Sequence, residues 1–320
     1  MKFMSRDVKI AATPWETLNE GLANEFCAQA EIAESLGFDS FWLPESHFGD
    51  NKSVPQPLTI LAAIAARTST IKLGTTSYLI TVRNPLQAAE EVAVLDRLSG
   101  GRLILGLGRG VQSAMFAAFD LPSKDKRKRF KLNLDIMRKA WAGEAVALED
   151  DGKPIVLAPL PVQSPHPPLW IAAFGPLALK QAGALGLPYL ASPVETLEAL
   201  KKNYALYNSA VAEHQAQTVN TVPLMRTIFV CDSTSKTNEV KQALTSAAQH
   251  SMRENHAKVE DWTIIGDTHY VSDKLSEYVE CLNASHFIAL ARLPGLSAKE
   301  KIQSHEKLLR LAAGCRSVAQ

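Results

Sequence analysis

The 320-residue sequence lacks the features that would place it in a membrane or on nucleic acid. No apolar run approaches the roughly 20 residues that cross a bilayer. The opening residues, MKFMSRDVKIAAT, contain no apolar core of a signal peptide. With 34 Lys and Arg against 33 Asp and Glu, the net charge of +1 gives no support to nucleic-acid binding. We therefore expect a cytoplasmic protein with small-molecule partners.

Cysteine is scarce, and its positions form no pattern. The four cysteines, at positions 27, 231, 281 and 315, have no metal-ligand spacing, and the eight histidines have none either. We expect reduced cysteines that mostly pack in the interior, and no metal site. The sequence also lacks G-x-S-x-G, C-x-x-C and P-loop motifs, so neither a nucleophilic hydrolase nor an NTPase is supported.

The most informative stretch that is present is NPLQAAEEVAVLDRLSGGRLILGLGRG, residues 84–110. Its Asn-Pro pair predicts a helix start, and apolar residues then recur at helical spacing until Ser99-Gly100-Gly101 ends the helix. Leu103-Ile104-Leu105 predicts a strand that is covered on both faces. Arg109 follows between two glycines at the carboxyl end of that strand, where a guanidinium can pair with a phosphate.

The rest of the chain alternates short apolar runs with helical patterns. Strands are predicted at 8–12, 38–43, 71–75, 103–105, 169–173, 188–190, 221–230 and 286–291. Helices are predicted at 22–36, 57–68, 130–141, 175–185, 194–212, 236–249, 273–282 and 298–313, and residues 251–266 are interpreted as a helix followed by a loop. About eight parallel strands with crossover helices predict an α/β fold, a (β/α)8 TIM barrel.

The barrel is expected to form a single domain, residues 1–320, with small insertions at about 144–165 and 250–268. Asp150-Asp151-Gly152 is a hairpin signal inside the first insertion. A doubly wound open sheet is the alternative fold, because periodicity alone does not separate the two.

In a parallel barrel the active site forms at the carboxyl ends of the strands. The residues expected there are aromatic, hydroxyl-bearing or charged: Trp15, Glu45, Ser46, His47, Thr75, Thr76, Ser77, Arg109, Phe174, Gly175, Ser192 and Arg292. Such a set suits a phosphorylated planar cofactor, although Trp15 is expected to pack in the interior. The basic run at 124–129 is either a solvated helix start or a means of steering an anionic cofactor to the barrel.

LDRLSGGR followed by GLGRG resembles the bacterial luciferase-like, flavin-dependent monooxygenase family. GFDSFWLPESHF at 37–48, KLGTTSYL at 72–79 and PPLWIAAFGPLALKQAGALGLP at 167–188 extend the resemblance over nearly the whole chain. The resemblance implies that Arg109 binds the flavin phosphate. It also implies a non-prolyl cis peptide between Thr76 and Ser77, with Thr75 to Ser77 supporting the flavin ring.

Two further groups of residues take roles from the resemblance. The cofactor-binding set continues at the start of a helix, with Phe174, Gly175, Pro176 and Leu177, where backbone N–H groups of Gly175, Leu177 and Ala178 are expected to hold phosphate. The catalytic set is Glu45, Ser46 and His47. The family usually has Glu-His-His-Phe here, and the serine in place of the first histidine argues against light emission from a long-chain aldehyde.

The implied activity is that of a flavin-dependent monooxygenase that uses reduced FMN and O2 to oxygenate a small organic substrate. A separate NAD(P)H flavin reductase or a nicotinamide donor would supply the reduced FMN. The open alternatives are a deazaflavin-dependent hydride-transfer oxidoreductase of the same superfamily, a non-catalytic flavin-binding barrel, and a barrel enzyme without flavin. The resemblance also implies a homodimer packed through its early helices, for which the alanine-rich stretch 58–66 would suit either an interface or burial.

Overall fold

The computed structural model describes residues 8–16, 22–49, 53–248 and 257–314. The chain forms two compact units, and each is described here by itself. Unit 1 comprises Met1–Thr17, Ile32–Phe41 and Ala173–Gln320, and unit 2 comprises Leu18–Glu31 and Trp42–Ala172. Strand β2 (Ser40–Leu43) and helix α1 (Leu22–Leu36) are each divided between the two units.

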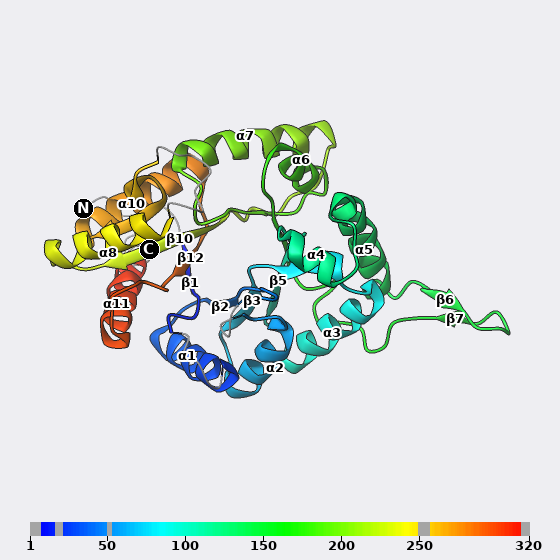
Figure 1. Ribbon diagram of the computed structural model, residues 1–320. Helices are drawn as coiled ribbons and strands as arrows, with labels where there is room; N and C mark the ends of the chain where they lie inside the picture. Colours follow the sequence, from blue (N-terminus) through cyan, green and yellow to red (C-terminus); the bar gives the residue numbers. More distant parts are fainter. Residues whose placement is uncertain (1–7, 17–21, 50–52, 249–256, 315–320) are drawn as a thin grey trace. The chain divides into compact units, whose positions relative to one another are not determined.

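The sheet of unit 2 is built around β5, in the middle of the stretch that organises the sequence. β5 (Leu103–Gly108) pairs in parallel with β3 (Lys72–Thr75), with β8 (Leu169–Ala172) and, at its carboxyl end, with β4 (Tyr78–Leu79). All six residues of β5 are buried, as a strand with two covered faces requires. Figure 1 shows the helices α2 (Pro57–Arg67), α3 (Pro85–Leu98) and α5 (Lys126–Trp141) in succession beside these strands.

The start of α3 forms as its sequence predicts. The side chain of Asn84 accepts hydrogen bonds from the backbone N–H groups of Leu86 and Gln87, at 2.9 and 3.3 Å, and Pro85 is the first helical residue. The helix ends before Gly100 and Gly101, which have φ angles of 65° and 80°. The following strand is three residues longer than predicted, because Gly106, Leu107 and Gly108 continue it to the edge of the sheet.

Two tryptophans fill the core of unit 2. The rings of Trp42 and Trp170 stack with centroids 4.7 Å apart and planes inclined by 21°. Gly74, on β3, faces the indole of Trp42 so closely that a Cβ atom at this position would overlap it. The packing of these strands therefore depends on a glycine opposite a large ring.

Helix α2 contains the alanine-rich stretch that was considered for a dimer interface. Its residues Leu58, Leu61, Ile64 and Ala65 are buried, and the helix packs beside α3 and β3 of its own unit. One face of the stretch therefore serves the core. The homodimer remains a prediction.

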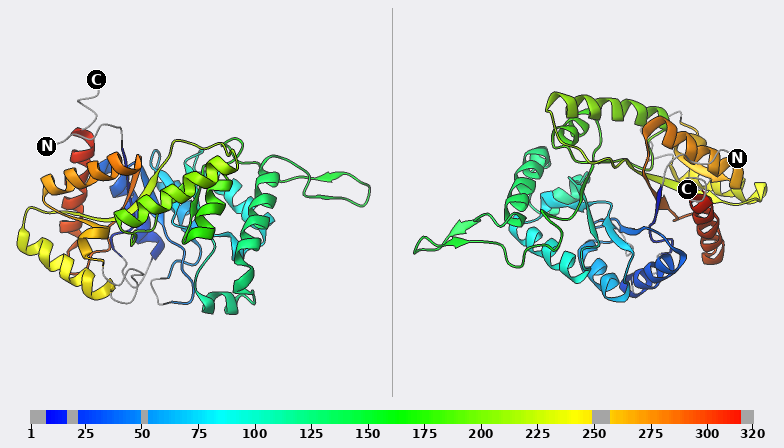
Figure 2. Two further views of the ribbon diagram at one scale, coloured as in Figure 1. Left: turned by 90° about the horizontal axis from the view of Figure 1, so that it is seen from above. Right: turned by 180° about the vertical axis from the view of Figure 1, so that it is seen from behind.

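A hairpin extends from unit 2 at the first expected insertion. β6 (Ala147–Leu148) and β7 (Pro154–Ile155) pair antiparallel through a turn that contains Gly152, which confirms the hairpin signal. Figures 1 and 2 show it reaching away from α3 and α5. Nearer β5, the short helix α4 (Ser113–Ala118) packs Met115 and Phe116 against Leu79.

The sheet of unit 1 is built around β10 (Pro223–Val230), which pairs in parallel with β11 (Thr263–Gly266) and β12 (His286–Leu290). β12 pairs with β1 (Lys9–Ala12), and β1 pairs with the first half of β2. β9 (Tyr189–Leu190) leads into Ala191, which bridges to Leu224 of β10. The helices of this unit are α6 (Pro176–Ala184), α7 (Leu197–Glu213), α8 (Thr234–Ala248), α9 (Val259–Trp262), α10 (Thr268–Leu282) and α11 (Ala298–Gly314).

One expectation about unit 1 is wrong. Residues 251–266 were interpreted as a helix and a loop within an insertion at about 250–268, but Thr263–Gly266 is a strand of the sheet, preceded by the one-turn helix α9. The Thr-Ile-Ile run favours a strand, and its four residues were too short to stand out. Residues 249–256 lie outside the described part of the chain.

The remaining strands and helices confirm the predicted alternation. In the main sheet all the pairings found among the described residues are parallel, as βα units require. Cys27, Cys231 and Cys281 are free thiols, and Cys315 lies outside the described residues. No helix in the described part of the chain is both long enough and apolar enough to cross a bilayer.

Candidate active site

The residue at the carboxyl end of β5 is a buried cation. Only 8% of the surface of Arg109 is exposed, and its guanidinium lies 4.7 Å from the centre of the Phe130 ring. Burial, and next the positive charge of Arg127, lower the pKa of Arg109 to about 10. An anion beside Arg109 would relieve both effects, because it would replace lost hydration and screen the two cations from each other.

The segment predicted to support a flavin ring lies directly against the end of β5. The peptide bond between Thr76 and Ser77 is cis, as the resemblance implied. The Thr75 hydroxyl donates a 2.8 Å hydrogen bond to the carbonyl of Gly106. The Ser77 hydroxyl occupies the space that a Cβ atom on Gly108 would need. Thr75, Ser77 and Arg109 are therefore brought together along one strand end.

Glu45 is the centre of a buried ion-pair network at the end of β2. Its side chain is fully buried, and its Oε1 atom lies 2.7 Å from both Nε2 of His47 and Nη1 of Arg83. Its Oε2 atom accepts a 3.0 Å hydrogen bond from the backbone N–H of Leu79. The carboxylate thus joins the candidate catalytic histidine to the segment that follows the cis peptide.

Aromatic rings cover the candidate catalytic histidine. Only 5% of His47 is exposed, and the ring of Phe119 meets it edge-on with centroids 5.2 Å apart. Phe48 lies 5.8 Å from His47 and 5.5 Å from Phe119, also measured between ring centroids. The histidine therefore has a carboxylate on one nitrogen and apolar walls beside its ring, a setting in which a proton is shielded from bulk water.

Arg83 is the functional candidate that sequence reasoning missed. Its side chain is 11% exposed, its Nη1 atom also donates to the carbonyl of Leu79 at 3.0 Å, and its guanidinium lies 4.1 Å above the ring of Tyr78. A buried glutamate generally needs a cation beside it. That rule would have prompted a search for the partner of Glu45, but 38 residues separate the two in sequence.

Ser46 forms two hydrogen bonds with Val54 across the loop that follows β2. Its hydroxyl accepts a 3.0 Å hydrogen bond from the backbone N–H of Val54, and its own N–H donates to the Val54 carbonyl at 3.0 Å. These two bonds give Ser46 a structural role. Its assignment to the catalytic set stays a prediction.

The basic run belongs in part to the surroundings of Arg109. α5 begins at Lys126, so the run forms a helix start. Arg127 is close enough to depress the pKa of Arg109, and Nε of Arg129 donates a 3.0 Å hydrogen bond to the carbonyl of Thr81. The Thr81 hydroxyl in turn donates to the Arg109 carbonyl at 2.8 Å. The run therefore helps to fix the loop that carries Arg109.

The other expected cofactor residues, Phe174 to Leu177, belong to unit 1. Gly175 is the N-cap of α6 with a φ of 82°, and Pro176 is the first helical residue. The Ala178 N–H, expected to bind phosphate, instead donates to the Gly175 carbonyl at 3.1 Å. The backbone of Leu177 lies in the first turn, where helices leave N–H groups without intrahelical partners, and the side chains of Phe174 and Leu177 are 36% and 58% exposed.

The remaining candidates near the strand ends of unit 1 differ in burial. Trp15 is 2% exposed and packs edge-on against Phe41 and His305, which confirms it as a packing residue. Arg292 is exposed, two residues beyond β12. Ser192 follows β9, with its backbone N–H donating to Glu195 at 2.8 Å.

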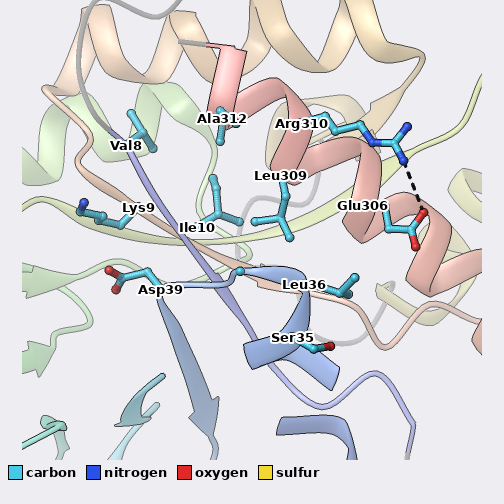
Figure 3. A pocket seen from close by; sticks show the side chains of 12 residues that line it. Val8, Lys9, Ile10, Ser35, Leu36, Asp39, Glu306, Leu309, Arg310 and Ala312 are labelled. Carbon is cyan, nitrogen blue, oxygen red and sulfur yellow. Dashed lines mark ion pairs between the residues drawn. The ribbon is translucent and has the colours of Figure 1, made fainter. Parts of the chain in front are cut away.

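A cavity of about 640 Å³ in unit 1 lies at the other end of β1. Figure 3 shows Lys9 and Ile10 on one side of it and Leu309 and Arg310 of α11 on another. The cavity is lined by residues at the start of β1 and the last turns of α1 and α11. Ligands of parallel barrels bind at the carboxyl ends of strands, so the candidate active site remains the end of β5.

Comparison with known proteins agrees with this geometry. The family model described as luciferase-like monooxygenase matches residues 4–282. The oxygenase component of the flavin-dependent trigonelline monooxygenase of Acinetobacter baylyi is 28% identical over 221 residues, 66% of this chain and 60% of that protein. The F420-dependent glucose-6-phosphate dehydrogenase of Amycolatopsis mediterranei is 31% identical over 176 residues, 52% of each chain. The chain spans about half of the length of several curated relatives, for example 47% of one from Sinorhizobium fredii.

The solved structures extend the likeness to the whole fold. The oxygenating constituent of 3,6-diketocamphane monooxygenase from Pseudomonas putida, solved in complex with FMN, has a TM-score of 0.81. Its sequence identity is 18%, and the match covers 96% of this chain and 98% of that one. The predicted TIM-barrel class is thereby confirmed, and the relatives include both flavin monooxygenases and F420-dependent oxidoreductases. The chain belongs to the luciferase-like monooxygenase family.

Proposed function

We propose that this protein is a monooxygenase that uses reduced FMN and O2 to oxygenate a small organic substrate. The observation that carries the proposal is Arg109, a buried guanidinium at the carboxyl end of β5 that faces a second cation, Arg127. A phosphate suits this position, because it offers oxygen acceptors and negative charge to a cation that has lost much of its hydration.

Other residues of unit 2 fit the same cofactor. The end of β5 carries Gly108 with the small hydroxyl side chain of Ser77 packed in front of it, so no large side chain stands there to block the approach of a flat ring system. When bound, reduced FMN would supply the activation of O2. The chain would anchor the phosphate through Arg109 and support the ring through residues 75–77.

His47 and Glu45 are the proposed polar and acid–base groups beside the substrate. A histidine that is hydrogen-bonded to a carboxylate is held in one orientation and can exchange a proton through its other nitrogen. The rings of Phe48 and Phe119 would keep water away from that proton. A separate NAD(P)H flavin reductase would supply the reduced cofactor, as the term oxygenase component implies for the trigonelline relative.

The second candidate function is hydride transfer with a deazaflavin cofactor. The F420-dependent relative favours it, with 31% identity over 176 residues. A deazaflavin coenzyme also carries a phosphate that Arg109 could bind. The choice between the two therefore depends on which ring system the protein prefers.

A cofactor titration tests the proposal. Oxidised FMN, anaerobically reduced FMN and the deazaflavin coenzyme are each titrated into the wild-type protein, Arg109→Ala and a control variant, Arg97→Ala. Arg97 is exposed, and its Nε atom donates to the carbonyl of Leu160 at 2.6 Å. We expect tightest binding of reduced FMN, weakened about tenfold or more, roughly 1.5 kcal/mol, in Arg109→Ala and unchanged in Arg97→Ala.

Each result decides between the candidates. Preference for the deazaflavin would move the function to hydride transfer and leave the Arg109 anchor in place. Equal affinity in the wild type and Arg109→Ala would remove the anchor from the proposal. Binding of none of the three compounds would contradict both functions.

A further inference from the structure

The network around Glu45 contains three donors for one carboxylate. The Arg83 guanidinium and the Leu79 N–H are permanent donors, and they contact Oε1 and Oε2 respectively. A carboxylate that is fully buried and held by a guanidinium and a backbone N–H is matched to its ionised form. Glu45 then has only acceptor atoms to offer to His47.

This arrangement fixes the protonation of the histidine. Nε2 of His47 lies 2.7 Å from Oε1 of Glu45, which already accepts from Arg83. Because an ionised carboxylate cannot donate, Nε2 must carry the proton. Nδ1 is then the nitrogen with the free lone pair, and contacts among the described residues give it no hydrogen-bond partner.

Arg83 is itself held rigidly. Its guanidinium lies 4.1 Å above the ring of Tyr78, and the Tyr78 hydroxyl donates a 2.7 Å hydrogen bond to Oε2 of Glu91 on α3. Nη1 contacts the Leu79 carbonyl as well as Glu45. Both contacts fix the direction of Nη1, so the cation is held at the carboxylate.

We propose that Arg83 is a positioning residue that keeps Glu45 ionised and His47 in the Nε2–H form, so that protons are exchanged at Nδ1 of His47 alone. Glu45 thereby becomes a positioning residue as well, and His47 is the single acid–base group of the pair. A proton taken from a bound hydroxyl or water converts the imidazole to an imidazolium, which faces the Glu45 carboxylate, and the same proton leaves again from Nδ1. The exchange step rests on the proposed function; the tautomer does not.

Nuclear magnetic resonance of the protein without ligand tests the tautomer directly. Protein labelled with ¹⁵N-histidine is studied through long-range ¹H–¹⁵N spectra at neutral pH, and His47→Asn identifies the signals of His47. The wild type should show a protonated Nε2 and an unprotonated Nδ1, with widely separated ¹⁵N shifts. Arg83→Met should reduce that separation because the two tautomers mix, and Arg83→Lys should restore most of it, because a lysine keeps a charged donor.

The chain offers a matched control in Arg67. It forms a bidentate ion pair with Glu31 at 2.9 and 2.7 Å, also in unit 2, but both side chains are about 40% exposed. Arg67→Met should leave the His47 signals unchanged. An Nδ1–H form in the wild type, or unchanged His47 signals in Arg83→Met, would overturn the proposal. If Arg83→Met does not fold, Glu45→Gln takes its place, and unchanged His47 signals there would equally contradict it.

Titration with reduced FMN separates this proposal from the proposed function. Arg83→Met should bind reduced FMN within twofold of the wild type, since in the described part of the chain the Arg83 side chain contacts Glu45, Gln56, Tyr78 and Leu79. A loss as large as that of Arg109→Ala would make Arg83 part of the anchor and end its role as a positioning residue. Failure of the wild type to bind reduced FMN would contradict the monooxygenase proposal but would not affect the conclusion about the His47 tautomer.

Discussion

The two arginines at the ends of β5 are the same residue type in opposite situations. Arg102 precedes the strand and is surrounded by neutral acceptors, whereas Arg109 follows it and faces another cation. The Arg102 guanidinium donates at 2.7–3.0 Å to the carbonyls of Ser99, Ile71, Ala65 and Thr68 and to the Thr68 hydroxyl. These bonds tie the end of α2, the start of β3 and the end of α3 together.

The surroundings of the two arginines distinguish a cation that holds the fold together from one that we propose binds an anion. A guanidinium can donate five hydrogen bonds, and Arg102 makes five with protein acceptors, so nothing remains for a ligand. The Arg109 guanidinium instead lies over the ring of Phe130, and burial and the charge of Arg127 lower its pKa, two effects that a bound anion would offset. The first arrangement stabilises the fold, and the second is the one that we propose for anion binding, at the end of the barrel where ligands bind.

The largest expected effect comes from Arg102→Met. The variant leaves several buried carbonyls without donors, so the free energy of unfolding should fall by about 4 kcal/mol. Chemical denaturation measures the loss, and the affinity of the folded fraction for reduced FMN should stay within twofold of the wild type. A small loss of stability, or a large loss of FMN affinity, would remove the contrast between the two ends of β5.

The second prediction concerns His305, a buried titratable side chain that, unlike the two arginines, can become neutral. His305 is 2% exposed between Trp15 and Phe38, and burial lowers its pKa from 6.5 to about 4. Between pH 6.5 and 4, His305 therefore binds a proton in the unfolded chain but stays neutral in the folded chain. The stability from neutral His305 is complete above pH 6.5 and falls by roughly 3 kcal/mol as the pH drops to 4.

Comparison with His305→Phe isolates this contribution. The variant keeps an aromatic ring between Trp15 and Phe38 and removes the titrating group, whose Nε2 atom finds no hydrogen-bond partner among the described residues. The difference in unfolding free energy between wild type and variant should change by about 3 kcal/mol between pH 7 and pH 4. A difference that is constant across this range would show that His305 titrates alike in both states.

Gly108→Ala probes the close contact beside Arg109. The added Cβ would overlap the Ser77 hydroxyl, so we expect a loss of about 2 kcal/mol in stability and weaker FMN binding. Adding Ser77→Ala should restore part of both, because it removes the clashing oxygen. Equal behaviour of the single and the double variant would indicate that the crowding lies elsewhere, for example at Leu79.

The smallest effect on stability is expected for Arg109→Met. Removing a buried charge whose pKa is lowered by burial and by Arg127 should change the free energy of unfolding by less than about 1 kcal/mol, in the direction of a gain. FMN affinity should nevertheless fall about tenfold. A loss of stability like that of Arg102→Met would make the two arginines equivalent and would remove the argument for an anion site.

The sequence predicted what depends on neighbours along the chain. Asn84 caps α3 because an N-cap involves only the three residues that follow it, and the turn at Gly152 is equally local. The position of Arg109 at the end of its strand followed from the local pattern, whereas its phosphate-binding role and the cis peptide at Thr76-Ser77 came from the family resemblance, since no local rule requires either. The strand Thr263–Gly266 was missed because four residues carry too little periodicity to count.

The contacts that define the candidate site could not be predicted from the sequence, because they join residues far apart along the chain. Arg83 and Glu45 are 38 residues apart, and hydrogen bonds from the segment after β3 to Leu43 and Glu45 at the end of β2 bring them together. The five acceptors of Arg102 come from three separate segments, so its structural role was hidden inside a motif that identified the family. The loop-closing role of Ser46 likewise depends on its hydrogen bonds with Val54, eight residues further along the chain.

The close contact between Gly74 and Trp42 limits which substitutions these positions can accept during evolution. Position 74 cannot acquire a side chain while an indole occupies the space in front of it, and Trp42 cannot move because it stacks on Trp170. Among related sequences the three positions should therefore change together: an alanine or larger residue at 74 should occur with a smaller ring or an aliphatic residue at 42. Laboratory evolution that starts from Gly74→Ala should recover its first compensating substitutions at Trp42.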